Sequence, residues 1–267
     1  MKRYLLDNKN IEAGARFAAL AEIFDPVSFA HFDKVGVEAG WHCWEVGAGG
    51  TSVIMELARR VGTDGYVFAT DIDTSWMTQE LQMPSTVDVC THDIALDAQP
   101  QRQFDFIHAR LVLVHIPERE KALKNMLNAL KPGGWILIED ADPALQPLAC
   151  INTLTDKELL ANRLRNSFRA LMSSREVDLE FGRKLPNLLN TMGMENVSAD
   201  GFFPLGMSAC NILEIATTKL IAPKLLEAKL ATQQEIDQHI KNVSSGELIL
   251  TTAPMISAWG QKPRQSI

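Results

Sequence analysis

Two glycines and a carboxylate lie close together early in the chain and could bind a ligand. Glu45 stands two residues before Gly47, and Gly47-Ala48-Gly49 follows an apolar segment, 41–46, which is expected to be a strand. Glycines directly after a strand permit torsions and a close ligand approach that side chains would block. A carboxylate at this distance is a poor neighbour for a pyrophosphate and suits a cationic group. The segment therefore predicts a turn that receives a positively charged part of a ligand.

Two further carboxylates follow the next two expected strands. Asp71 comes 22 residues after Gly49, at the end of segment 66–70, and Asp93 follows segment 87–90. A carboxylate at the end of the second strand can bind both hydroxyls of a ribose. The dinucleotide fingerprint needs a third glycine where this chain has Ser52, which disfavours a nicotinamide-dependent reductase. The combination indicates a nucleoside with a positively charged tail.

The surrounding segments alternate between strand and helix patterns, which is typical of a parallel sheet covered on both faces. Right-handed crossovers bring the carboxyl ends of such strands to one edge, where ligands bind. The three carboxylates, the glycines and Ala109 should therefore meet there. The expected strands are 41–46, 66–70, 87–90, 104–108 and 135–139, the helices are 53–61 and 118–130, and 131–134 is a tight turn.

The flanking regions have a different character. Two helices, 11–24 and 28–35, should precede the first strand, separated by Asp25-Pro26. After residue 140 we expect helices at 153–181, 185–192 and 209–241, the last broken at 222–223, and strands at 197–203 and 255–259. We interpret the chain as one domain, 1–267, made of an N-terminal helical cap (1–38), a ligand-binding core (39–140), and lid helices with the last two strands (141–267).

Bulk composition excludes several classes of protein. A formal net charge of −7 argues against nucleic-acid binding. The four cysteines form no C-x-x-C pair, so no metal site is expected. The start of the chain lacks the apolar run of a signal peptide, and nothing approaches the roughly 20 apolar residues of a membrane span. These features predict a cytoplasmic protein without membrane contact.

Taken in order, the motifs between residues 41 and 140 resemble those of the class I S-adenosylmethionine-dependent methyltransferases. The resemblance implies an α/β fold: a doubly wound, mostly parallel, seven-stranded Rossmann-like sheet whose final strand is antiparallel. It also implies an N-terminal helical cap and helical insertions after strands five and six. The matching segments are Glu45-x-Gly47-x-Gly49, Asp71, Asp93-Ile94, Phe104–Arg110 and Leu130–Gly134.

The resemblance further implies S-adenosylmethionine as cofactor and S-adenosylhomocysteine as product. Glu45 would face the cofactor amine and Asp71 the ribose. Asp93 would hold adenine, or merely cap the following segment. Arg110 would be a wall of the pocket or part of a surface ion pair. The residues expected to bind cofactor are Glu45, Gly47, Ala48, Gly49, Asp71, Ile72, Asp93, Ile94, Ala109 and Arg110.

Within this family the chain looks like the small-molecule branch of secondary metabolism and quinone-type chemistry, where methyl transfer is an in-line displacement. His115 is a candidate base, although packing or turn stabilisation is the alternative. A macromolecule methyltransferase and an enzyme using the cofactor for cyclase or pericyclase chemistry are competing hypotheses. The acceptor, the methylated atom, and the choice between monomer and homodimer stay open.

Overall fold

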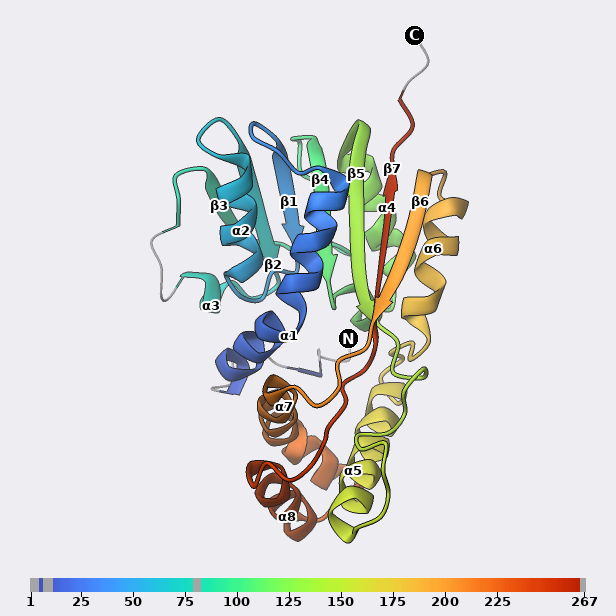
Figure 1. Cartoon of the computed structure of the whole chain (residues 1–267). Helices are drawn as coiled ribbons and strands as arrows, with labels where there is room; N and C mark the ends of the chain where they lie inside the picture. Colours follow the sequence, from blue (N-terminus) through green and yellow to red (C-terminus); the bar gives the residue numbers. More distant parts are fainter. Residues whose placement is uncertain (1–4, 7–11, 79–82, 265–267) are drawn as a thin grey trace.

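Seven strands form one sheet in the order β3-β2-β1-β4-β5-β7-β6 in a computed structural model that describes residues 5–6, 12–78 and 83–264 (Figure 1). Only β7 runs antiparallel to its neighbours, β5 and β6. The predicted seven-stranded, mostly parallel fold is therefore confirmed. The strands are β1 (His42–Val46), β2 (Tyr66–Asp71), β3 (Val87–Thr91), β4 (Phe104–Arg110), β5 (Leu130–Ala141), β6 (Glu195–Phe202) and β7 (Met255–Gln261).

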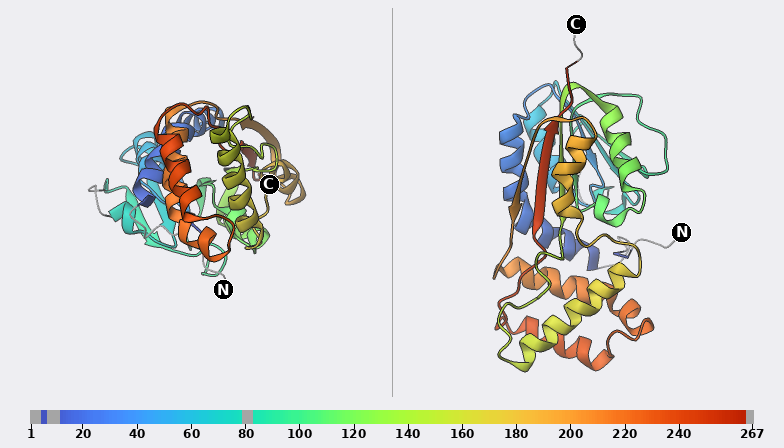
Figure 2. Two further views of the ribbon diagram at one scale, coloured as in Figure 1. Left: turned by 90° about the horizontal axis from the view of Figure 1, so that it is seen from below. Right: turned by 90° about the vertical axis from the view of Figure 1, so that its right-hand side faces the viewer.

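Helices cover both faces of the sheet because each has an apolar stripe. In α2, Val53, Ile54, Leu57 and Val61 are buried, and Gly62 ends the helix with φ +65°. Helices α1 and α2 pack on one face, and α4 and α6 pack on the other (Figure 2). The bounds are α1 (Glu12–Val35), α2 (Ser52–Val61), α3 (Ser75–Thr78), η1 (Leu113–His115), α4 (Arg119–Ala129), α5 (Asp156–Ser173), α6 (Phe181–Thr191), α7 (Ser208–Glu227) and α8 (Gln233–Ser244).

Three helices form a separate layer beyond the carboxyl ends of the parallel strands. Figures 1 and 2 show α5, α7 and α8 gathered there, at the end toward which the β1 arrow points. Capping boxes begin two of them: Thr155 with Glu158 at α5, and Thr232 with Glu235 at α8. Within the described ranges, no helix has the length and apolar character needed to cross a membrane. The helical insertions expected after strands five and six are thus present and lie beyond the strand ends.

Two prolines that were expected to break helices lie inside them. The expected pair of helices at 11–24 and 28–35 is one helix, α1, which continues through Pro26 (Ile11 lies outside the described residues). Figure 1 shows that α1 bends along its length, as a lost backbone hydrogen bond at proline allows. Helix α7 continues through Pro223, and the break falls at 228–232 instead. In both helices, buried side chains on either side of the proline outweigh the local cost.

The other corrections concern element ends. The expected helix 153–181 is only α5, because the chain turns after Ser173 before α6 begins at Phe181. Strand β5 already starts at Leu130, so the expected tight turn 131–134 is part of this strand. The pairing of β5 with β4 is irregular between Phe104 and Phe106, and Gly133 adopts φ +79° there. A bulge therefore accommodates the glycines without ending the strand.

A buried polar cluster fastens α1 to the sheet. Glu139 of β5 is its centre: its carboxylate lies 3.1 Å from Nε2 of His108 and 3.0 Å from Nδ1 of His31, and it accepts a hydrogen bond from Ser28. His108 also lies 2.6 Å from the Glu45 carboxylate. Every member is at most 2 % exposed; the cluster consists of Ser28, His31, Glu45, His108, Glu139 and Ser257.

The cluster holds charge inside the protein. Burial alone would lower the pKa of His108, but Glu45 and Glu139 raise the pKa to about 9. Burial alone would raise the pKa of Glu139, whereas its hydrogen bonds to His108 and His31 lower the pKa below the ordinary value. At neutral pH a protonated His108 therefore lies between β1 and β5. Removing one partner of such a pair leaves a buried charge uncompensated, which typically costs about 3–5 kcal/mol.

The cluster predicts how stability changes with pH. His108 has a higher pKa in the folded protein than in the unfolded chain, so its contribution is complete below pH 6.5 and is lost as pH rises through about 9. The unfolding free energy of His108→Gln, from urea titrations, should therefore be well below that of wild type at pH 6.5, with the difference narrowing at pH 9. His42→Gln, outside the cluster, should show no narrowing. A constant difference for His108→Gln would contradict the charged state assigned to His108.

Candidate active site

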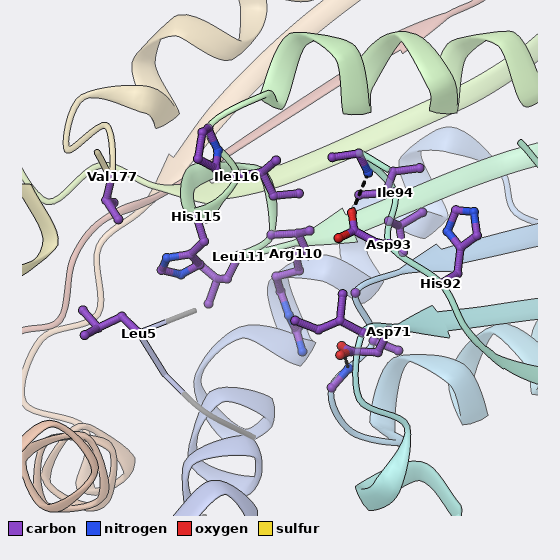
Figure 3. Close-up of a pocket in the computed structure, with 18 of the residues that line it drawn as sticks. Leu5, Asp71, His92, Asp93, Ile94, Arg110, Leu111, His115, Ile116 and Val177 are labelled. Atoms are coloured by element: carbon purple, nitrogen blue, oxygen red, sulfur yellow. Dashed lines mark hydrogen bonds between the residues drawn. The ribbon is translucent and has the colours of Figure 1, made fainter. Parts of the chain in front are cut away.

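A cavity of about 720 Å³ lies where the carboxyl ends of β1, β2 and β4 meet α1 and the lid region (Figure 3). Its volume is typical of a small-molecule site. Most of the residues predicted from the sequence come together there. Those that line the cavity are Gly47, Ala48, Gly49, Asp71, Ile72, Asp93, Ile94, Arg110 and His115, whereas Glu45 and Ala109 are not among its lining residues.

The turn after β1 has room only for glycine at two positions. Gly47 and Gly49 adopt φ +67° and +62°, which L side chains rarely do. A Cβ on Gly47 would approach the Val112 side chain to 2.4 Å, and one on Gly49 would approach the Phe17 ring to 2.7 Å. The glycines therefore let β1 end directly beneath these two side chains at the cavity wall.

Asp71, at the end of β2, is fixed by backbone groups. Its carboxylate accepts hydrogen bonds from the N–H of Gly49 at 3.0 Å and of Asp73 at 2.9 Å. Burial raises the pKa of the Asp71 carboxyl, while these N–H groups act in the opposite direction. The carboxylate is 6 % exposed and borders the cavity. The two backbone hydrogen bonds thus hold the carboxylate in one orientation at the border of the cavity.

Asp93 performs the simpler of its two predicted roles and also borders the cavity. Its Oδ1 accepts hydrogen bonds from the N–H groups of Ala95 at 2.9 Å and Leu96 at 3.2 Å, so it caps the turn after β3. Figure 3 shows Asp93 and Asp71 on the same side of the cavity, with Ile94 near Asp93. The capping bonds place this turn at the wall that Ile72 and Ile94 also form.

Glu45 does not face the cavity, contrary to our expectation. Alternation along β1 places it on the same face as Cys43, the face covered by α1, and its carboxylate pairs with His108. Burial raises its pKa, an effect that His108 opposes. Ala109 is likewise turned away, into the core on the α4 side of the sheet. Neither side chain is placed to touch a ligand in the cavity.

Arg110 and His115 both line the cavity, with different electrostatics. Arg110 donates to Asp25 at 2.9 Å and to Ser28 at 3.0 Å, so its charge is matched within α1. Burial, with the nearby charges of Arg16 and Arg119, lowers the pKa of His115 to about 3. A neutral imidazole of such low basicity accepts a proton poorly, which favours a positioning role for His115 over that of a base.

The N-terminal helices and the insertion after strand five were expected to enclose the site, but the sequence analysis named none of the residues that α1 and the turn between α5 and α6 contribute to its wall. Arg16, Phe17 and Leu20 come from α1, and Glu176, in that turn, adopts φ +67°. One signal was available. Arg16 interrupts a helical stripe whose other members, including Ala13, Ala19 and Ile23, are buried, and a charged residue at such a position commonly has a function. For the turn at 175–177 the sequence held no comparable signal.

Comparison with known proteins identifies the family. A parallel sheet with a glycine turn and a carboxylate at the end of β2 defines a nucleoside-binding α/β protein, and residues 42–199 match the family model described as a methyltransferase domain. The chain belongs to the class I S-adenosylmethionine-dependent methyltransferases, whose cofactor is S-adenosylmethionine.

The individual relatives share 28–30% sequence identity with parts of this chain. The ubiquinone/menaquinone biosynthesis C-methyltransferase of Vibrio cholerae is 30% identical over 124 residues, which are 44% of this chain and 48% of that protein. Its Vibrio vulnificus counterpart is 28% identical over 180 residues, 62% of this chain and 68% of that protein. The chain thus spans about half to two thirds of the curated relatives it matches.

Among solved structures, phosphoethanolamine N-methyltransferase 2 of Haemonchus contortus, in complex with S-adenosyl-L-methionine, superposes with a TM-score of 0.57 at 15% identity. The superposition covers 94% of this chain and 57% of that chain. At this identity the likeness shows a shared fold.

The glycine turn generates a testable prediction. Gly47→Ala should weaken binding of S-adenosylhomocysteine at least tenfold, because the added Cβ forces Val112 and the turn apart. Gly36→Ala is the matched control: Gly36 has φ +82° but open space around its Cβ position, so it shares only the torsional cost of about 1 kcal/mol. Calorimetric titration would measure both. Equal binding by the two variants would exclude the contact with Val112 as the reason for glycine.

His115 generates a second prediction. Because the pKa of His115 is lowered to about 3, its ring resonances should not titrate between pH 5 and 8 in NMR spectra of the protein labelled at histidine. His31 should differ: burial opposes its charge, but hydrogen bonds to Glu139 and Asp200 raise the pKa above 6.5. His115→Gln would assign the signal. If the His115 resonances instead shifted with a midpoint near pH 6.5, the prediction would be wrong and His115 would again be a candidate general base.

Proposed function

We propose that this protein transfers the methyl group of S-adenosylmethionine to an apolar small molecule bound in the same cavity. One observation carries the proposal: a single cavity of about 720 Å³ has nucleoside-type polar groups at one end and apolar side chains at the other. The cofactor and an acceptor would therefore be neighbours in one space. A role in secondary metabolism, or in quinone-type chemistry such as the names of the Vibrio relatives describe, is part of this proposal.

The residues at the polar end fit the cofactor. Asp71, held by two N–H groups, would bind the ribose hydroxyls, and the turn that Asp93 caps would hold adenine with Ile72 and Ile94. The methionine end would lie beside the glycine turn, where Gly47 and Gly49 carry no side chains of their own and pack beneath Val112 and Phe17. Glu45 would support this turn from inside the sheet, through His108, and would not bind the cofactor amine itself.

The other end of the cavity suits a hydrophobic acceptor. Its wall comes from four separate parts of the chain: the residue Leu5 ahead of α1, α1 itself, the segment after β4, and the turn between α5 and α6. These parts contribute a set of apolar side chains: Leu5, Leu20, Leu111, Val112, Ile116, Pro117 and Val177. Charged side chains lie among them: Arg16, Glu118, Arg175 and Glu176. The apolar side chains would bind a ring or an aliphatic group by excluding water. The net charge of −7 disfavours a nucleic-acid substrate.

When bound, the cofactor supplies a methyl group already activated by its positively charged sulfur, and displacement leaves S-adenosylhomocysteine. This chain then has to align the acceptor with the methyl group and to exclude water from the two reactants. Asp71 and the glycine turn fix one reactant, and the apolar wall fixes the other. His115, neutral at physiological pH, would orient the acceptor by a hydrogen bond.

Binding and transfer can be tested in sequence. S-adenosylhomocysteine should bind wild type with micromolar affinity by calorimetry, and Asp71→Ala should weaken binding at least tenfold, because the ribose loses its acceptors. Asp88→Ala is the control, since Asp88 lies on neighbouring β3, bonded to the Tyr66 hydroxyl. No binding by wild type at millimolar ligand would overturn the proposal.

Transfer itself would be followed with S-adenosylmethionine labelled in its methyl group. Hydroxyaromatic and quinol acceptors would be compared with bulk RNA and protein. Label in the small-molecule fraction is expected. Label only in macromolecules, or conversion of an acceptor without uptake of label, would contradict small-molecule methyl transfer and favour a competing hypothesis.

A further inference from the structure

Arg16 is a buried cation that faces the cavity and has no anionic partner among the residues that the structure describes. Its side chain belongs to α1, is only 6 % exposed, and lines the cavity. Within the part of the chain that the structure describes, its one recorded interaction is with the face of the Phe17 ring, whose centroid lies 5.8 Å from Cζ. Arg110, the neighbouring cation, is by contrast neutralised by Asp25. A buried guanidinium without a carboxylate is costly, so its position needs an explanation.

The location of Arg16 is defined by its neighbours. The Phe17 ring lies against the glycine turn, close to Gly49 and Gly50. The guanidinium is beside that ring, and its charge also reaches His115, where it helps to lower the pKa. Arg16 therefore lies between the glycine turn and His115. Figure 3 shows His115 and Asp71 on opposite sides of the cavity.

We propose that Arg16 binds the α-carboxylate of S-adenosylmethionine and so fixes the methionine end of the cofactor. This inference rests on the proposed function, since the cofactor is the one ligand of the site that must bring a carboxylate. A guanidinium binds carboxylate through two parallel hydrogen bonds, which set orientation as well as affinity. With the ribose at Asp71 and the carboxylate at Arg16, the cofactor is held at both ends, and the sulfur between them has a fixed position.

The charges of the cavity favour this assignment. Asp71 and Asp93 lie at the nucleoside end, where they would repel a carboxylate. Arg110 is already engaged with Asp25 and Ser28. Arg175, the third arginine that lines the cavity, comes from the turn between α5 and α6 and not from the elements around the glycine turn. Arg16 is therefore the cation beside that turn. A carboxylate on the acceptor would satisfy the same guanidinium from the His115 side, and the experiment separates these two sources.

The test compares two ligands that differ by one carboxylate. Wild type, Arg16→Gln and Arg16→Lys are titrated by calorimetry with S-adenosylhomocysteine and with its decarboxylated analogue. Wild type should bind S-adenosylhomocysteine at least tenfold more tightly than the analogue. Arg16→Gln should bind S-adenosylhomocysteine at least tenfold more weakly than wild type but the analogue within about twofold, so that the preference disappears. Arg16→Lys should retain part of the preference for S-adenosylhomocysteine over the decarboxylated analogue.

Arg60→Gln is the matched control, because Arg60 contacts α1 through Asp33 and the Phe29 carbonyl without lining the cavity. It should leave the preference intact. An equal loss for both ligands in Arg16→Gln would show a merely structural role and overturn the inference. Unchanged binding of both ligands would also overturn it and direct attention to an acidic acceptor. Failure of wild type to bind either ligand would instead refute the proposed function.

Discussion

The burial of two carboxylates beneath α1 is the constraint on which much of this structure depends. Glu45 and Glu139 enter the interior from β1 and β5, where isolated charges would be unstable. His108, between them on β4, compensates both, and His31 brings a second imidazole from the helix. A cluster of this kind contributes little net stability compared with apolar packing, but it is satisfied in only one arrangement. It therefore specifies where α1 lies on the sheet.

Because the helix is fixed at its carboxyl-terminal half, its amino-terminal half is fixed too. Beyond Pro26 the same helix carries Phe17 onto the glycine turn and Arg16 into the cavity. Asp25, beside the proline, is joined to Arg110 at the end of β4. The interior of the sheet and the wall of the site are thus parts of one connected arrangement. Glu45, which does not line the cavity, thus stands two residues before Gly47, which does.

The sequence predicted well whatever depends on local periodicity. The locations of the core strands, the glycine turn and the position of Asp71 follow from apolar runs and from the rule that parallel strands end at one edge. Prediction from the sequence failed where a residue's position is determined by contacts with residues far away in the chain. Glu45 looked like a ligand-facing residue because its partner, His108, is 63 positions away. Pro26 and Pro223 looked like helix ends because the packing that retains them comes from other elements. The acceptor wall is assembled from segments that are far apart in the chain. Its one recognisable sequence signal is Arg16, the charged residue in the buried stripe of α1.

The position of β7 has a consequence for the order in which the molecule is completed. This strand lies between β5 and β6, both of which precede it in the chain, with the lid helices α7 and α8 made in between. During synthesis, β5 must therefore present an unpaired edge while more than a hundred residues are added. The half of the molecule with β6 and the lid has no place in the sheet until β7 emerges. Such a nascent chain exposes the unpaired N–H and C=O groups of an edge strand, to which chaperones can bind. Truncations that remove β7 should therefore aggregate rather than yield a smaller folded protein.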